Sequence, residues 1–212
     1  MFKFKSNIDL INYLKNKKVL KTKDIIEAFE KVDRKEFVDK KYVNLAYMDV
    51  PLNIGYDVTI SQPTTVAFML ELLEPKRGDK ILDIGSGSGW TTGLLAQIIG
   101  SFGFVYGVEI IPELVKKGKN NLKRFDFKNY EILQTRQELG LIDKKPFNRI
   151  LVSAASKTIP NILLEQLGKG GVLVLPVRNS ILKISKNETG EVKIQEHYGF
   201  SFVPLIENQY QY

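Results

Sequence analysis

The sequence predicts an α/β protein built on a doubly wound, mostly parallel β-sheet with an antiparallel C-terminal end. Three observations predict this class. Short apolar segments alternate with helical patterns between residues 63 and 177, which is typical of a parallel sheet covered by helices. The apolar segment "KILDIG" runs directly into a glycine-rich loop. The stretch "SILKISKNETGEVKIQEHYGF" alternates on both sides of residues 187–190 and predicts a hairpin.

Two helices are expected before the sheet. Ser6 is placed to cap the first and Thr22 to cap the second. The apolar positions recur at helical spacing and are Ile8, Ile11 and Leu14 in the first helix and Ile25, Ile26 and Phe29 in the second. The next segment, "NLAYMDVPLNIGYDVTIS", contains prolines, a glycine and aromatics. We expect it to be a functional loop rather than regular structure.

The core elements follow in order from residue 63. Pro63 opens a helix and Ser61 lies near its cap. The later elements are a strand at 80–85, a helix from about Gly89 to Ile99, a strand at 104–109, a helix from Pro112 to about Leu122, strands at 130–134 and 149–154, a helix at 158–167 that ends in a "GKGG" turn, and a strand at 172–177. We expect one domain of 212 residues, with residues 1–60 as an N-terminal helical cap and active-site loop and residues 61–212 as the cofactor-binding core.

Composition excludes some kinds of chemistry. The chain has no cysteine, which excludes disulfides and thiolate metal sites, and we expect no metal. Residues 84–108 carry no charge, but their seven glycines predict loop, helix and strand inside a soluble fold rather than a membrane span. The net charge is +7, with lysines scattered among acids, which favours a solvated surface over a nucleic-acid site. The N-terminus lacks a signal-peptide pattern, so we expect a cytoplasmic protein, and a monomer.

The glycine-rich loop predicts a nucleoside cofactor. Gly85, Gly87 and Gly89 follow the first core strand at alternate positions, whereas the dinucleotide fingerprint is G-x-G-x-x-G. Asp83 precedes the loop, where a carboxylate would oppose a pyrophosphate but suit a cationic amino group. Glu109 ends the next strand, where an acid accepts ribose hydroxyls. This combination favours S-adenosylmethionine over NAD and a Rossmann-like methyltransferase fold.

Several segments resemble one family of methyltransferases. They are "DRKEFV", "AYMDVPLNIG", "VTISQPTTVAFMLELLEP", "KILDIGSGSGW", "YGVEIIPELV", "PFNRILVSAA", "LLEQLGKGGVLVLPV" and "FVPL". Together they make the chain similar to the protein-L-isoaspartate O-methyltransferases from about residue 8 to residue 211. The glycine loop is general to methyltransferases, whereas "TISQP" and "FVPL" are more specific. The resemblance implies methylation of the α-carboxyl of L-isoaspartyl residues in damaged proteins and peptides, after which the ester closes to a succinimide.

The resemblance also implies roles for individual residues. Ser61 of "TISQP" would be the active-site serine, and the neighbouring residues would line the cleft. Glu109 would hold the ribose, and the loop from Asp83 would hold the methionine end. The implied cofactor-binding residues are Thr59, Ile60, Asp83, Gly85, Ser86, Gly87, Ser88, Gly89, Glu109, Arg136, Gln137 and Gln211.

The implied chemistry needs no strong base. An α-carboxyl has a pKa of about 3.5 and is already an anionic nucleophile at pH 7. Alignment and removal of water should therefore supply most of the rate. Ser61 would orient the carboxylate through a hydrogen bond, or serve as a helix cap, or do both. The single histidine, His197, lies in the predicted hairpin and is expected to be structural or exposed.

The adenosine region departs from the family pattern. The family usually has Gly-Asp-Gly where this chain has Thr135, Arg136 and Gln137. An arginine cannot accept a hydrogen bond from an adenine amino group. Either the Gln137 carbonyl accepts that bond or Arg136 stacks on the adenine ring.

Two other functions compete with isoaspartyl repair. The positive charge and Arg136 suit a methyltransferase that acts on RNA or on another peptide or small molecule. However, the segment "SAAS" after "RILV" offers only small groups where enzymes that methylate base amines typically place polar residues, prolines and an aromatic. The other alternative is a homologue that kept the fold and only binds.

Overall fold

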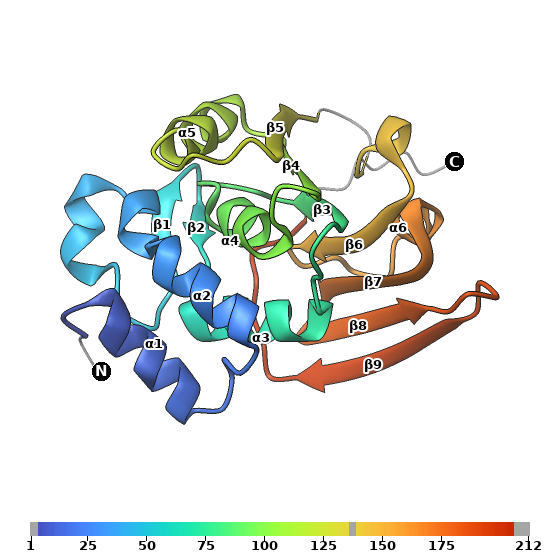
Figure 1. Ribbon diagram of the computed structural model, residues 1–212, viewed down its shortest axis with the longest axis horizontal. Helices are drawn as coiled ribbons and strands as arrows, with labels where there is room; N and C mark the ends of the chain where they lie inside the picture. Colours follow the sequence, from blue (N-terminus) through green and yellow to red (C-terminus); the bar gives the residue numbers. More distant parts are fainter. Residues whose placement is uncertain (1–3, 136–138, 206–212) are drawn as a thin grey trace.

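A seven-stranded mixed sheet forms the centre of the computed structural model, which describes residues 4–135 and 139–205 (Figure 1). The strands lie in the order β5-β4-β3-β6-β7-β8-β9. The pairs from β5 to β7 are parallel, and β7-β8 and β8-β9 are antiparallel. The strands are β3 (Lys80–Ile84), β4 (Phe104–Glu109), β5 (Tyr130–Gln134), β6 (Phe147–Val152), β7 (Leu167–Val177), β8 (Ser180–Lys186) and β9 (Val192–Tyr198). The predicted fold class is confirmed.

The sheet is doubly wound because both faces of its strands are apolar. Adjacent residues of a strand point to opposite faces, so Ile81 packs into one core and Leu82 into the other. The first core also takes up side chains from the five helices α1 to α5, and the second takes up those of α6. The helices are α1 (Asn7–Asn16), α2 (Lys23–Lys31), α3 (Pro63–Leu73), α4 (Trp90–Ile99), α5 (Pro112–Leu122) and α6 (Asn161–Gln166).

The N-terminal helices form as predicted, with two differences in detail. Ser6 and Asp9 make a reciprocal capping box at the start of α1. The buried face of α1 is Leu10, Ile11 and Leu14, and Ile8 is 63% exposed, so the expected apolar position at Ile8 is wrong. Thr22 is the N-cap residue of α2, but its hydroxyl donates to Glu71 on α3 (2.7 Å) and accepts no hydrogen bond from the helix.

The segment expected to be an irregular loop contains a β-hairpin, so that prediction was wrong. Strand β1 (Leu52–Gly55) pairs antiparallel with β2 (Val58–Ile60). Tyr56 and Asp57 make the turn with positive φ angles of 56° each, which non-glycine residues rarely adopt. Short 3₁₀ helices, η1 (Arg34–Phe37) and η2 (Lys40–Leu45), connect α2 to this hairpin.

The expected "GKGG" turn is part of a strand, which is a second correction. Helix α6 has only six residues, and β7 begins at Leu167. Phe147 pairs with Leu167 and Arg149 with Val172, so the glycine segment forms an irregular bulge within β7. A third 3₁₀ helix, η3 (Ile142–Lys144), precedes β6.

Arg34 connects the N-terminal segment to the start of α3. Its side chain is fully buried, and its guanidinium lies over the Trp90 ring at 5.4 Å from the ring centroid. The guanidinium donates to five backbone carbonyls, those of Ala46 (2.7 Å), Met48 (3.2 Å), Val50 (2.9 Å), Ile60 (3.4 Å) and Ser61 (3.1 Å). Burial lowers the pKa of Arg34 to about 9, against an opposing effect of Asp49, so the group is charged at pH 7.

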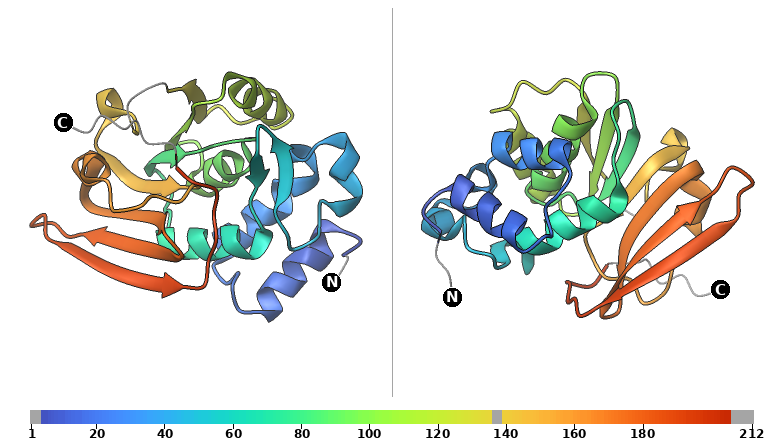
Figure 2. Two further views of the ribbon diagram at one scale, coloured as in Figure 1. Left: turned by 180° about the vertical axis from the view of Figure 1, so that it is seen from behind. Right: turned by 60° about the horizontal axis from the view of Figure 1, so that its bottom comes forward.

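The segment after β9 returns to the centre of the molecule. It runs back across the carboxyl ends of the strands (Figure 2) and bonds to the segment after β6. The Ala155 N–H donates to the Val203 carbonyl (2.8 Å), and the Leu205 N–H donates to the Ala155 carbonyl (2.8 Å). Residues 200–205 therefore lie beside the strand ends that carry the glycine loop.

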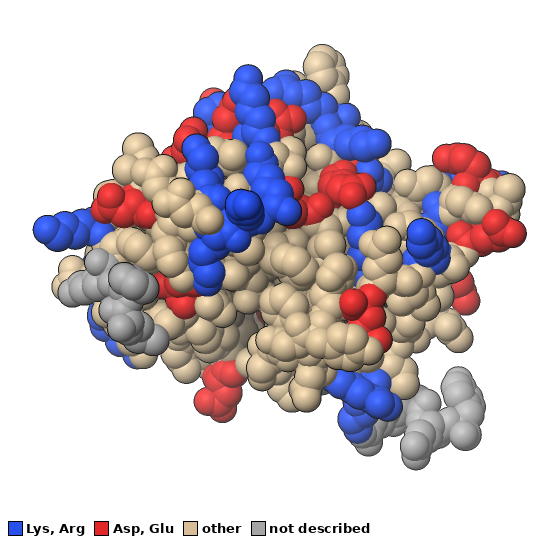
Figure 3. All heavy atoms as spheres, turned by 90° about the horizontal axis from the view of Figure 1, so that it is seen from below, with Lys and Arg blue, Asp and Glu red and all other residues tan. Residues whose placement is uncertain are grey.

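The surface carries both signs of charge. On the face in Figure 3, lysine and arginine side chains gather along one side with acidic side chains among them. The expected absence of a nucleic-acid partner stays a prediction, as do the monomeric state and the cytoplasmic location. Among the described residues, no helix is both long enough and apolar enough to cross a membrane.

Candidate functional site

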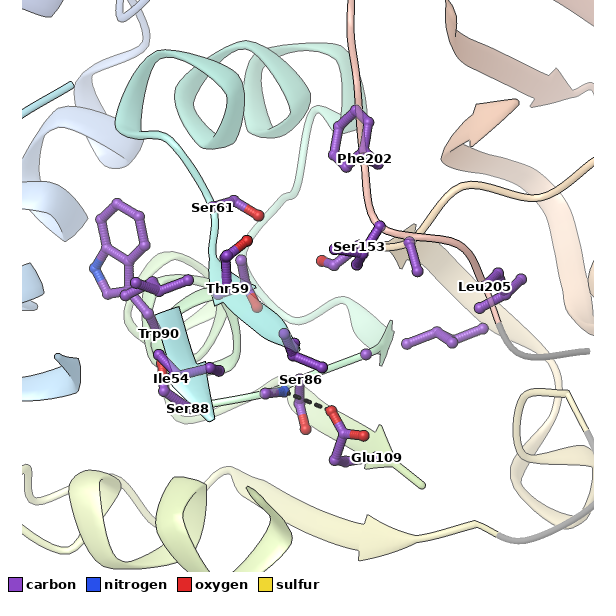
Figure 4. A pocket seen from close by; sticks show the side chains of 18 of the residues that line it. Ile54, Thr59, Ser61, Ser86, Ser88, Trp90, Glu109, Ser153, Phe202 and Leu205 are labelled. Atoms are coloured by element: carbon purple, nitrogen blue, oxygen red, sulfur yellow. Dashed lines mark hydrogen bonds between the residues drawn. The ribbon is translucent and has the colours of Figure 1, made fainter. Parts of the chain in front are cut away.

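A cavity of about 620 Å³ lies at the carboxyl ends of β3, β4 and β6. The chain leaves β3 towards β4 on one side and later returns to β6 on the other, which is the switch point where open α/β sheets bind ligands. Several segments supply the walls (Figure 4): the β1-β2 hairpin with Ser61, the start of α3, the glycine loop, the end of β4, residues after β5 and after β6, and the C-terminal segment.

The glycine loop is held by its backbone. The N–H groups of Gly85 and Ser86 both donate to the Val108 carbonyl, at 2.9 and 3.1 Å. All three loop glycines have positive φ angles. A Cβ on Gly89 would lie 3.2 Å from the Cα and carbonyl oxygen of Gly118 on α5. Because of these glycines, the loop lies close against α5 and ends at the N-terminus of α4.

Glu109 ends β4 as predicted and lines the cavity. Its side chain is buried, and Oε2 accepts a hydrogen bond from the Gly87 N–H (3.0 Å). Oε1 accepts from the N–H groups of Ile110 (2.8 Å) and Ile111 (3.1 Å). These three bonds use most of the acceptor capacity of the carboxylate and fix its orientation. Remaining acceptor capacity lies on Oε2, next to the glycine loop.

Asp83 is fully buried and does not line the cavity. Its Oδ2 accepts hydrogen bonds from the hydroxyls of Thr91 (2.8 Å) and Thr92 (2.7 Å), while Oδ1 has no partner among the described residues. Burial raises the pKa of Asp83 to about 6, the two threonine hydrogen bonds oppose this rise, and Glu109 adds to it. Thr91 lines the cavity, so it separates Asp83 from a ligand there.

Ser61 lines the cavity and does not cap α3. The N-cap residue is Gln62, without a side-chain cap. Asp49 instead accepts hydrogen bonds from the backbone N–H (2.8 Å) and the hydroxyl (2.6 Å) of Thr64. The possible role of Ser61 as a helix cap is therefore wrong. Its hydroxyl has no hydrogen bond within the part of the chain that the structure describes, and Figure 4 shows it pointing towards Ser153 across the cavity.

The remaining predicted residues fall into three groups. Gly89, the N-cap residue of α4, does not line the cavity. Thr59, Ile60, Gly85, Ser86, Gly87 and Ser88 line the cavity. Arg136, Gln137 and Gln211 lie outside the described residues. Thr135 lines the cavity, and its N–H donates to the Glu109 carbonyl (3.0 Å). Thr91, Trp90 and Phe202 also line the cavity and were not predicted. Trp90 ends the motif "KILDIGSGSGW" and Phe202 begins "FVPL", whereas no sequence signal points to Thr91.

The cavity suits a nucleoside with a cationic end. Its volume is within the usual range for small-molecule sites. The Oγ of Ser86, which lines the cavity, is buried without a partner among the described residues, and Glu109 adds an oriented carboxylate. Within that part of the chain no group of three or more His, Cys, Asp or Glu side chains is placed to hold a metal ion.

The sheet order, the glycine loop and the acid at the end of β4 define a Rossmann-like methyltransferase of the class that uses S-adenosylmethionine. The model of the family "Protein-L-isoaspartate(D-aspartate) O-methyltransferase (PCMT)" matches residues 5–210, and the chain belongs to this family.

Relatives and a solved structure agree with this assignment. The chain is 39% identical to the protein-L-isoaspartate O-methyltransferase of Ignicoccus hospitalis over 206 residues, which cover 95% of this chain and 97% of the relative. It is 40% identical to that of Pyrococcus horikoshii over 201 residues, which cover 92% of this chain and 90% of the relative. A crystal structure of a PCMT from Plasmodium falciparum in complex with S-adenosyl-L-homocysteine has a TM-score of 0.86, is 25% identical, and matches over 97% of this chain and 100% of that one.

The buried Asp83 predicts a pH-dependent stability. Its pKa is about 6 in the folded chain against 3.8 in an unfolded one, so it stabilises the fold fully below about pH 3.8. That contribution is lost as the pH rises through 6 and amounts to about 3 kcal/mol. We expect the free energy of unfolding of Asp83→Asn, taken relative to that of the unchanged protein, to rise by about that much from pH 4 to pH 7. Urea unfolding at both pH values measures the difference, and a difference that does not change with pH contradicts the assignment.

Proposed function

We propose that this protein transfers a methyl group from S-adenosylmethionine to the α-carboxyl of L-isoaspartyl residues in damaged proteins and peptides. One observation carries the proposal. A single cavity joins an oriented acceptor for a nucleoside, Glu109, to a serine hydroxyl with no other partner among the described residues, Ser61. The relatives carry the name of this activity, and the solved structure holds the demethylated cofactor. We further propose that residues 1–212 act as one domain, because residues of α1 and α2 share a core with β3.

The cofactor would lie along the glycine loop. The backbone of this loop and the Oε2 of Glu109 would hold its amino-acid and ribose parts. Thr91 would contact the ammonium group, because it stands between the cavity and Asp83 and already donates its proton to that carboxylate. When bound, S-adenosylmethionine supplies an electrophilic methyl group and leaves as neutral S-adenosylhomocysteine.

The acceptor needs orientation rather than deprotonation. A carboxylate oxygen forms the new bond to the methyl carbon, and no proton moves. Among the described residues that line the cavity, Glu109 is the only ionisable one, and His197 lies elsewhere, with its ring 5.3 Å from that of Phe68. The Ser61 hydroxyl would donate to the second carboxylate oxygen and direct the first towards the methyl group.

The apolar walls would exclude water from the reacting atoms. Ile54, Ile60, Trp90 and Phe202 line the same cavity as Ser61. Methyl transfer cancels one negative and one positive charge, so a site with little water favours it. The small side chains of Ser153 and Ala154 leave space for the peptide backbone beside the C-terminal segment.

Methyl transfer from radiolabelled S-adenosylmethionine tests the function. Matched peptides that differ only in L-isoaspartate or L-aspartate are incubated with the protein, and base-labile methyl ester is counted on each. We expect label on the isoaspartyl peptide alone. Equal label on both peptides, or label on RNA and on neither peptide, contradicts the proposal.

Ser61→Ala should lower kcat about 10- to 100-fold, because the variant loses one hydrogen bond to a charged carboxylate. The dissociation constant of S-adenosylhomocysteine, measured by calorimetry, should change less than about twofold, since Ser61 has no role in holding the cofactor. Ser101→Ala, at an exposed turn, is the matched control. An equal loss in kcat and in cofactor affinity argues against this role for Ser61.

A further inference from the structure

One wall of the cavity is held in place by a residue that does not touch the cavity. Leu139 and Gly140 line the cavity beside Thr135, beyond the end of the edge strand β5. They lie outside any strand or helix, between the end of β5 at Gln134 and the start of η3 at Ile142. Something else must fix this wall.

The fully buried side chain of Gln166 is hydrogen-bonded to both Leu139 and Leu141, and we call this pair of bonds the clasp. Gln166 is the last residue of α6. The amide Oε1 of Gln166 accepts a hydrogen bond from the Leu141 N–H (2.7 Å), and Nε2 donates to the Leu139 carbonyl (3.0 Å). Nε2 also donates to the Ile162 carbonyl (3.0 Å) in the preceding turn of α6. Both N–H groups of the amide are therefore used, and the bond within α6 fixes its orientation.

Gly140 lies directly against this amide. Its φ angle is +93°, and a Cβ at this position would lie 2.4 Å from Oε1 of Gln166 and 2.5 Å from Nε2. Only glycine allows both the backbone conformation and the close approach. Because Gly140 already touches the amide, the wall cannot move closer to it.

The clasp is anchored in a rigid part of the molecule. Leu163 and Leu167, on either side of Gln166, are fully buried in the second core. Leu139 and Leu141 pack against that same core. The amide thus connects the wall at Leu139 and Gly140 to the second core, which packs around α6 and β7.

We propose that Gln166 is a positioning residue that shapes the cofactor side of the cavity through Leu139 and Gly140, and does so without contact to the cofactor. The inference rests on the proposed use of this cavity for S-adenosylmethionine. A leucine or methionine at this position would fill the space but leave the Leu139 carbonyl and the Leu141 N–H without the partners that the amide supplies. Leu139 and Gly140 line the cavity together with Thr135, whose N–H donates to the carbonyl of Glu109, whereas Ser61 belongs to the segment after β2.

The test compares Gln166→Met with the unchanged protein by two measurements. The first is the dissociation constant of S-adenosylhomocysteine by calorimetry, which we expect to rise about tenfold, the equivalent of one lost hydrogen bond. The second is hydrogen exchange of the Leu141 amide without any ligand, which we expect to become faster. The KM for the isoaspartyl peptide at saturating S-adenosylmethionine should change less than about twofold.

Two variants complete the design. Gln195→Met, on the exposed strand β9, is the matched control and should leave all three quantities unchanged. Gln166→Glu keeps the acceptor for the Leu141 N–H and loses both donors, so it tests the clasp if Gln166→Met does not fold. It should weaken S-adenosylhomocysteine binding while it leaves the Leu141 amide protected.

The outcomes separate this inference from the proposed function. An unchanged protein that does not bind S-adenosylhomocysteine overturns the proposed function and the inference together. If the unchanged protein binds and the folded Gln166 variants bind equally well, the inference alone is overturned. A rise in the peptide KM as large as the rise in the dissociation constant of S-adenosylhomocysteine also overturns it, because that result indicates general loosening of the fold.

Discussion

The buried guanidinium of Arg34 is the constraint on which the arrangement of the site depends. A charged group that is taken out of water must find hydrogen-bond partners, and Arg34 finds them in five backbone carbonyls between residues 46 and 61. These bonds hold residues 46–61, which have little regular structure, around the guanidinium. The last of the five carbonyls belongs to Ser61, so the same interaction that closes the N-terminal segment over Trp90 also places the serine at the cavity.

The opposite side of the cavity is built by close approach of backbones rather than by charge. Gly89 of the loop and Gly118 of α5 meet where neither tolerates a larger side chain, and Gly107 of β4 lies against Ser86 and Thr92 in the same way. The glycine loop therefore lies deep enough for Gly87 to bond to Glu109. Polar atoms are oriented here before any ligand arrives, which lowers the cost of binding.

Local patterns in the sequence predicted the parts of the structure that depend on local interactions. Periodic apolar positions gave the helices and core strands, and the spacing of Gly85, Gly87, Gly89 and Glu109 indicated a nucleoside site. The errors arise where distant groups decide the outcome. The β1-β2 hairpin is held by Arg34, and the cap of α3 comes from Asp49, 15 residues before Thr64. No local pattern indicates that the threonines of α4 bury Asp83, whose expected role towards the cofactor stays a prediction. The clasp by Gln166 spans 25 residues to Leu141 and has no local signal.

The central claim is that this site aligns a carboxylate with a methyl donor and takes up no proton. The pH dependence of kcat with an isoaspartyl peptide tests it most directly. Glu109 is the only ionisable residue among the described residues that line the cavity, and its carboxylate already accepts three backbone hydrogen bonds. The acceptor carboxyl has a pKa of about 3.5. We therefore predict that kcat stays within about twofold between pH 7 and pH 9. A kcat that falls about tenfold per pH unit below an apparent pKa in that interval would show that a general base is required, and would contradict the account.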